Sequence, residues 1–172
     1  MNVLMIILRI IHVLAGIFWV GFAIFNIAFL QPTIRATGAE GQKTFQYLMR
    51  KTKLMSSVYV AATLTTLTGL IQYAIVSHMQ WSFVNSGWGL VITIGSVAGL
   101  IAWIIAIHFI RSIFNKIGTL GQEIQSHDGA PEPAQLEQMQ QLTGRLGQFA
   151  KTAVVFMIIS VIGMAAARYA NF

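Results

Sequence analysis

The chain has 172 residues, of which 56% are hydrophobic and only 9% are charged. Soluble domains carry about 25% charged residues, so this composition excludes an ordinary water-soluble globule. Eleven Lys and Arg against five Asp and Glu give a net charge of +6. In so apolar a chain, that excess favours loops facing an anionic membrane surface over a nucleic-acid interface. The sequence contains no cysteine, which excludes disulfides, thiolate catalysis, Cys-ligated iron–sulfur clusters and c-type haem attachment.

Four segments are long and apolar enough to cross a membrane, which takes about 20 mostly apolar residues. They are residues 3–30, 54–77, 88–112 and 150–170. The first segment lacks a basic leader and a small-residue cleavage site, so it is expected to be a retained helix rather than a signal peptide. The sequence therefore predicts an all-α, integral membrane four-helix bundle in which residues 1–172 form a single domain.

The basic residues predict the orientation of this bundle. They concentrate in the two long connections, residues 31–53 and 113–149, and at their borders, whereas the connection from Ser77 to Gly87 has neither Lys nor Arg. Under the positive-inside rule, both long loops are cytoplasmic, and both termini lie outside with the short loop. The expected location is the inner (plasma) membrane of the cell, crossed several times.

Both long loops are expected to contain helical extensions. Pro32 opens the first loop and predicts the end of a helix there. A short interfacial helix should follow, with apolar residues at helical spacing. The third span is expected to continue through residues 115–125 and to break at the HDGAPEP stretch. From Ala134 onwards, apolar residues recur every three or four positions and predict an amphipathic helix that leads into the fourth span. The apolar residues of the interfacial helix are Phe45, Leu48 and Met49.

The third span also contains a G-x-x-x-G pattern, formed by Gly95 and Gly99. Small residues at this spacing let two helix backbones approach closely in a membrane. Because such patterns are common inside bundles, internal packing is favoured over a dimer interface.

Ionisable side chains inside a membrane are costly, so they are candidates for function. His12, His108, Arg9 and Arg168 lie within or at the ends of spans, whereas His78 and His127 fall in loops and are expected to be solvated. No Asp or Glu lies within any span, which disfavours a carboxylate proton relay, a cation pump and a di-metal centre.

His12 is the most informative of these residues. It lies about 14 Å along the first span, inside the expected hydrocarbon layer. Two roles are open for it: a hydrogen bond to a Ser, Thr or carbonyl group of a neighbouring helix, or coordination of haem iron. Arg9 precedes it by one helical turn, where a guanidinium could pair with a haem propionate. This combination strengthens the cofactor interpretation.

The remaining candidates for metal binding are His108 and Met164. His108 lies about 30 Å along the third span, more than about 10 Å deeper than His12, so the two histidines should not bind one haem. His108 is either an interface histidine or a ligand of a second metal centre. Met164 in the fourth span is a candidate second ligand beside His12, as is His78 if the second span extends to it, although most methionines in bundles only fill gaps.

The motif around His12 resembles a known group of membrane proteins. The stretch Arg9-Ile-Ile-His12-Val-Leu-Ala-Gly-Ile-Phe-Trp19-Val-Gly21 looks like the first helix of four-helix proteins that include the copper-resistance D (CopD)-like proteins and the HemJ-type protoporphyrinogen oxidases. The resemblance implies a b-type haem near His12 in a four-helix bundle. It continues more loosely over most of the chain, at Tyr47–Lys53, Leu67–Leu70 and Trp88–Leu90.

The chain departs from both groups at identifiable places. The HemJ-type proteins have a functional Lys near the start of the third helix, whereas residues 88–100 contain none, so the resemblance does not extend to protoporphyrinogen oxidase activity. Segments rich in Met and His, as expected on the outer side of a copper importer, are also missing.

The leading hypothesis is a haem-b-binding membrane protein that acts as a small redox or electron-transfer component, with membrane oxidoreductase activity left open. One alternative is a cofactor-free structural or assembly subunit of a larger membrane complex. Another is a transporter of copper or a small solute, with copper as the alternative metal. The expected partners are the lipid bilayer and either a second copy of the chain or a larger membrane complex, and no nucleic acid.

Overall fold

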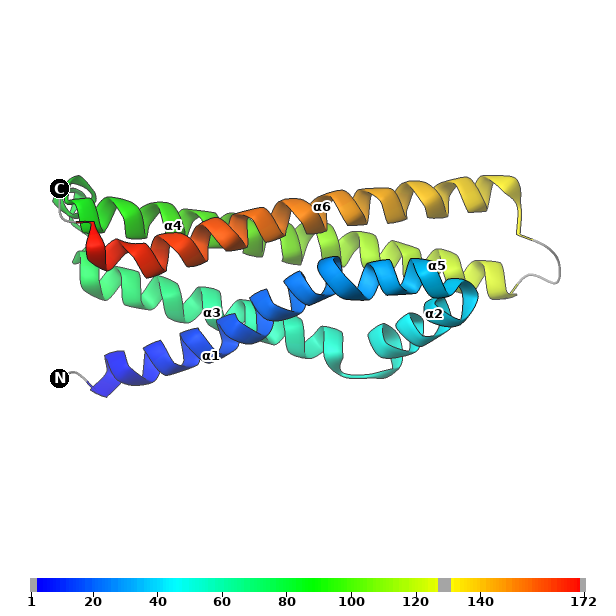
Figure 1. The fold of residues 1–172 in the computed structure, drawn as a ribbon, viewed down its shortest axis with the longest axis horizontal. Helices are drawn as coiled ribbons and strands as arrows, with labels where there is room; N and C mark the ends of the chain where they lie inside the picture. The colour runs from blue at the N-terminus through cyan, green and yellow to red at the C-terminus, as the bar shows by residue number, and fades with distance from the viewer. Residues whose placement is uncertain (1–2, 127–130, 171–172) are drawn as a thin grey trace.

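The computed structural model describes residues 3–126 and 131–170, and these are helical almost throughout (Figure 1). No strand occurs in this part of the chain, so the expected all-α class is confirmed. The elements, in chain order, are α1 (Val3–Phe25), the π-helix η1 (Asn26–Leu30), α2 (Gln31–Lys51), α3 (Leu54–Ser77), the 3-10 helix η2 (Trp81–Asn85), α4 (Gly87–Ile104), the π-helix η3 (Ile105–Ile110), α5 (Arg111–Ser126), α6 (Pro133–Ala166) and the 3-10 helix η4 (Ala167–Tyr169).

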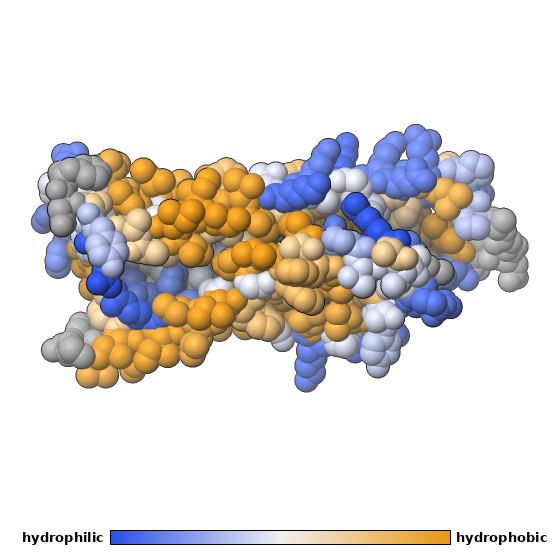
Figure 2. All heavy atoms as spheres, viewed as in Figure 1, coloured by the Kyte–Doolittle hydropathy of each residue, from blue (hydrophilic) through white to orange (hydrophobic). Residues whose placement is uncertain are grey.

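Four continuous helical rods are long and apolar enough to cross a membrane. Their outward surface is largely apolar over one half of the molecule, as Figure 2 shows, and hydrophilic groups gather at the end formed by α2, α5 and the start of α6. We call that end the loop end and the opposite end, which holds Val3 and Tyr169, the terminal end. Exposed Ile, Leu, Val and Phe side chains on the rods indicate that lipid, rather than water, covers them. The rods comprise Val3–Gly38, Leu54–Ser77, Gly87–Ser126 and Pro133–Tyr169.

The first rod does not end at Pro32, so this expectation is wrong. Pro32 lies in the first turn of α2, and the helix continues through it from η1. Because Pro32 has no N–H, the rod gives up one backbone hydrogen bond at this point without being interrupted. The interruption comes instead at Gly38, whose φ of 58° and ψ of −130° are not helical. A glycine adopts a positive φ without the steric cost that a Cβ brings.

The second long connection is helical on both sides of its break, as expected. Helix α5 extends the third rod to Ser126, and α6 runs without interruption from Pro133 into the fourth span. Glu132 and Gln135 form a capping box at the start of α6, in which each side chain binds a backbone N–H of the other residue. The expected break covers residues 127–133, of which 127–130 lie outside the described residues.

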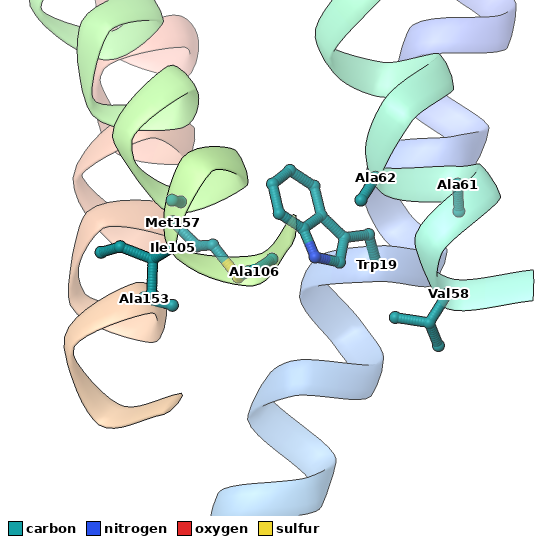
Figure 3. Packing of buried hydrophobic residues seen from close by; sticks show 9 residues of the cluster. Trp19, Val58, Ala61, Ala62, Ile105, Ala106, Ala153 and Met157 are labelled. Carbon is teal, nitrogen blue, oxygen red and sulfur yellow. The ribbon is translucent and has the colours of Figure 1, made fainter. Parts of the chain in front are cut away.

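The rods associate as two pairs. Helix α1 packs along α3, and α4 packs along α6, while the contacts between the pairs are less extensive (Figure 1). Trp19 of α1 joins the pairs near the middle of the bundle and is only 5% exposed. In Figure 3, its indole extends from α1 toward Ala106 and Met157 of the second pair. The same buried cluster contains small residues of α3, α4 and α6, namely Ala61, Ala62, Ala102 and Ala153.

The glycines of α4 form the interface with α6. A Cβ added to Gly163 would lie 2.9 Å from the Cα of Gly95, and one added to Gly95 would lie 3.1 Å from the carbonyl oxygen of Ser160. Gly99 faces the same helix, with its Cβ position 2.9 Å from the Ser160 hydroxyl oxygen. The G-x-x-x-G pattern therefore packs inside the chain, as expected, and brings two backbones into direct contact.

We expect Gly163→Ala to lower the thermal unfolding midpoint of the detergent-purified protein, because the new methyl group must push one backbone away from another. Overpacking of this kind costs about 1–3 kcal/mol. Gly21→Ala is the matched control, because nothing lies within 4 Å of its Cβ position, and alanine favours a helix over glycine by about 1 kcal/mol. Equal unfolding midpoints for the two variants would contradict the described α4–α6 contact.

Candidate functional site

His12 lies on the face of α1 that packs against α3. Its Nδ1 atom is 2.8 Å from the carbonyl oxygen of Thr65. A carbonyl oxygen only accepts hydrogen bonds, so we assign the proton of the ring to Nδ1. The Thr68 hydroxyl lies 3.4 Å from the same nitrogen and donates its own proton to the carbonyl of Leu64. In a neutral imidazole of this tautomer, Nε2 carries a lone pair and no proton.

A glycine on α3 provides the space for the imidazole ring. A Cβ added to Gly69 would lie 2.8 Å from Cε1 of His12 and 3.1 Å from its Nδ1. Any other residue at this position would displace the ring from the Thr65 carbonyl. One turn further along α1, the Cβ position of Gly16 is 3.5 Å from the Thr65 methyl group, an ordinary contact. The ring therefore lies directly against the backbone of α3.

The opposite ring nitrogen, Nε2, has no hydrogen-bond partner in the described part of the chain, and the side chain of His12 is half-buried. A histidine that binds a metal normally donates its other ring N–H to a carbonyl or carboxylate, which fixes the tautomer and the ring orientation. His12 has this arrangement on its Nδ1 side. The hydrogen-bonding role expected for His12 is thus confirmed, and the same bond leaves Nε2 available to a ligand.

Gln72 adds a second polar link between α1 and α3, one turn closer to the terminal end. Its amide nitrogen donates to the carbonyl oxygens of Thr68, at 3.1 Å, and of Leu8, at 3.4 Å. Polar bonds between membrane helices each contribute about 0.6 kcal/mol on average, so their main effect here is on register.

Arg9 lies one turn from His12 toward the terminal end and is exposed. Among the described residues, no carboxylate forms an ion pair with it, since the single salt bridge joins Lys43 to Glu40 on α2.

Two side-chain contacts between α3 and α4 show which part of the second helix pair lies at the same depth in the bundle as His12; we call this depth the level of His12. Tyr73 and Thr93 share a hydrogen bond of 2.8 Å, and the indole N–H of Trp103 donates to the Thr63 hydroxyl at 3.4 Å. Because α3 and α4 are antiparallel, the segment of α3 that contacts His12 lies opposite the region of α4 around Gly99.

Met164 lies about one helical turn away from the level of His12, measured along the bundle. Gly99 contacts Ser160 of α6, and Met164 follows Ser160 by one helical turn, about 6 Å, toward the terminal end. Its side chain is half-buried. Both hydrogen bonds of the His12 ring go to α3, so the described contacts do not join His12 to Met164.

The other histidines are separate from His12. His108 is exposed in η3 and follows Gly99 by nine residues toward the loop end, or roughly 13 Å. The two expected metal-binding histidines are therefore not brought together, in agreement with their expected depths. His78 is exposed and ends α3 in a left-handed conformation, with φ of 49°, and His127 lies outside the described residues. Within residues 3–126 and 131–170, no cluster of three or more His, Cys, Asp or Glu side chains is placed to hold a metal ion.

Sequence reasoning missed a second polar location, near the loop end, where Asn26 and Tyr59 line a cavity. A buried Oδ1 atom and a buried hydroxyl there lack partners in the described structure. The available signal was weak, because a single Asn and a single Tyr in long apolar segments have no characteristic spacing.

No family model, curated protein or solved structure matches this chain. The class of protein is therefore described from the fold and the site alone. It is an all-α bundle of four apolar rods, in which a histidine is held by a carbonyl group where two helices meet at glycines.

We expect Gly69→Ala to break the bond between His12 and Thr65, because the methyl group would occupy the space of the ring. The ¹⁵N NMR spectrum of histidine-labelled protein reports the protonated Nδ1 of His12, and its signals can be assigned by their loss in His12→Ala. These signals should shift in Gly69→Ala and persist in Gly16→Ala, where the added Cβ makes only an ordinary contact of 3.5 Å. Identical His12 signals in wild type and Gly69→Ala would refute the described ring position.

Proposed function

We propose that this protein binds b-type haem within the membrane through Nε2 of His12 and acts as a small redox or electron-transfer component. The observation that carries the proposal is the bond from Nδ1 of His12 to the Thr65 carbonyl, which leaves the Nε2 lone pair without a partner in the described structure. Iron in b-type haem takes a neutral imidazole as its axial ligand.

The residues around His12 fit such a role. The Thr65 carbonyl orients the imidazole and makes its free nitrogen a stronger electron donor. Gly69 lets the ring lie against the α3 backbone, which restricts its rotation. The apolar side chains of α1 exclude water and lower the local dielectric constant. Bound haem would supply one-electron redox chemistry, at a potential tuned by its ligands and burial.

Arg9 and Met164 complete the proposed site. Arg9 is one turn from His12, and its guanidinium has no ion-pair partner among the described residues, so its charge is available to a propionate. Met164 is proposed as a second residue that would hold the haem iron, because it lies in α6 within about one helical turn of the His12 level and a thioether is a known iron ligand.

We also infer that the loop end faces the cytoplasm. In the structure, Lys and Arg side chains from α2, α5 and the start of α6 are exposed at this end. The connection that contains η2, at the terminal end, has neither. The positive-inside rule relates this asymmetry to a cytoplasmic loop end in the plasma membrane. The exposed residues are Arg35, Lys43, Lys51, Lys116 and Arg145.

His12→Ala should abolish haem binding or leave haem high-spin and exchangeable, because an axial ligand is lost. The bundle should still fold, since the removed hydrogen bond is worth only about 0.6 kcal/mol. His108→Ala is the matched control, and it should keep the wild-type ratio of haem to protein. The measurement is that ratio, from absorption and protein assay, in samples of equal expression and monodispersity.

Two results would contradict this assignment. If His108→Ala loses haem while His12→Ala keeps it with an unchanged spectrum, the cofactor lies at the loop end. A wild-type protein that stays colourless after expression with sufficient haem would favour a cofactor-free subunit or a transporter instead.

A further inference from the structure

A cavity of about 100 Å³ lies on the loop-end side of Trp19, away from His12. Both helix pairs contribute to its walls, as do α2 and the two π-helices. Eight of the nineteen lining residues are aromatic or methionine, among them Trp19, Phe22, Phe45, Phe114, Met49 and Met55, and most of the others are aliphatic. Aromatic faces favour a planar ring over a flexible chain, and methionine side chains repack readily around a ligand.

Two buried polar atoms belong to residues that line this cavity. Oδ1 of Asn26 and the hydroxyl of Tyr59 are shielded from solvent and have no hydrogen-bond partner in the described structure. An unsatisfied buried polar group costs about 1–3 kcal/mol, and few occur in native proteins. The guanidinium of Arg111 lies 5.6 Å from the centre of the Tyr59 ring, so it contacts the ring face rather than the hydroxyl.

The backbone around the cavity is also unusual. Asn26 and Ile27 belong to η1, while Ala106 and Ile110 belong to η3, and all four line the cavity. A π-helix accommodates an extra residue in a turn and is frequently associated with functional sites. The first and the third rod therefore each contain a π-helix, and both π-helices border this cavity.

We propose that this cavity binds the ring of a membrane-soluble aromatic diol, the reduced form of a quinone. One hydroxyl donates to Oδ1 of Asn26, and the other exchanges a hydrogen bond with the Tyr59 hydroxyl, while the aromatic and methionine side chains contact the ring. The cavity volume of about 100 Å³ is smaller than the cavity of about 150 Å³ that accepts benzene, so a ring enters it only when the flexible methionine side chains repack around the ligand. The proposal concerns binding alone and does not depend on haem.

The test uses hydroquinone, the smallest diol of this kind, as the probe, with the 172-residue chain in lipid nanodiscs under anaerobic conditions. Binding is measured by equilibrium dialysis for wild type, Tyr59→Phe and Asn26→Leu. Each cavity variant should bind the diol about fivefold more weakly, the effect of one lost hydrogen bond. Tyr47→Phe is the matched control for Tyr59→Phe, because Tyr47 is 66% exposed and does not line the cavity.

Two further comparisons complete the test. para-Xylene, in which methyl groups replace the two hydroxyls of hydroquinone, should bind more weakly than the diol to wild type and equally to both cavity variants. His12→Ala should bind the diol as wild type does, which separates this proposal from the haem site. The proposal would be overturned if wild type shows no saturable binding, if both cavity variants bind the diol unchanged, or if para-xylene binds as tightly as the diol.

Discussion

Membrane helices gain no hydrophobic free energy from touching each other rather than lipid, so this bundle depends on close contact between backbones. Glycines provide that contact in both helix pairs. Gly95 and Gly163 bring α4 against α6, and Gly69 brings α3 against the imidazole of α1. The pairs then meet around Trp19, whose large side chain fills the space between small residues. Dispersion contacts and a few interhelical hydrogen bonds thus replace the apolar core that stabilises a soluble protein.

The same close contact creates the proposed haem site. Because Gly69 has no side chain, the ring of His12 reaches the Thr65 carbonyl, and that bond determines which nitrogen carries the proton. Polar groups in a low-dielectric interior need partners, so the few that lack one are the natural positions for ligands. The buried atoms without a partner in the described structure are Oδ1 of Asn26 and the hydroxyl of Tyr59, at the loop-end cavity, and the hydroxyl of Thr65, and Nε2 of the half-buried His12 also has none. The Trp19 cluster separates the two locations.

The sequence was sufficient for features that depend on composition or on spacing within one helix. Four apolar spans, helical extensions beyond them, the internal packing of Gly95 and the different levels of His12 and His108 all follow from such patterns. The expectation at Pro32 failed because it came from a local rule about proline, whereas the helix continues from η1 into α2 through this residue. The His12 tautomer required knowledge of a residue 53 positions away in the chain. The two π-helices and the cavity between the rods have no local signature, because they arise from how four separate segments pack.

Haem binding through His12 is tested most directly by the reduced-minus-oxidised absorption spectrum of the wild-type protein, expressed with sufficient haem and purified in detergent as a monodisperse sample. If His12 holds haem, the spectrum will contain a Soret band and a b-type α band, and the haem content will approach a fixed ratio to protein. A folded, monodisperse sample with no Soret band would contradict the assignment of His12 as a haem ligand.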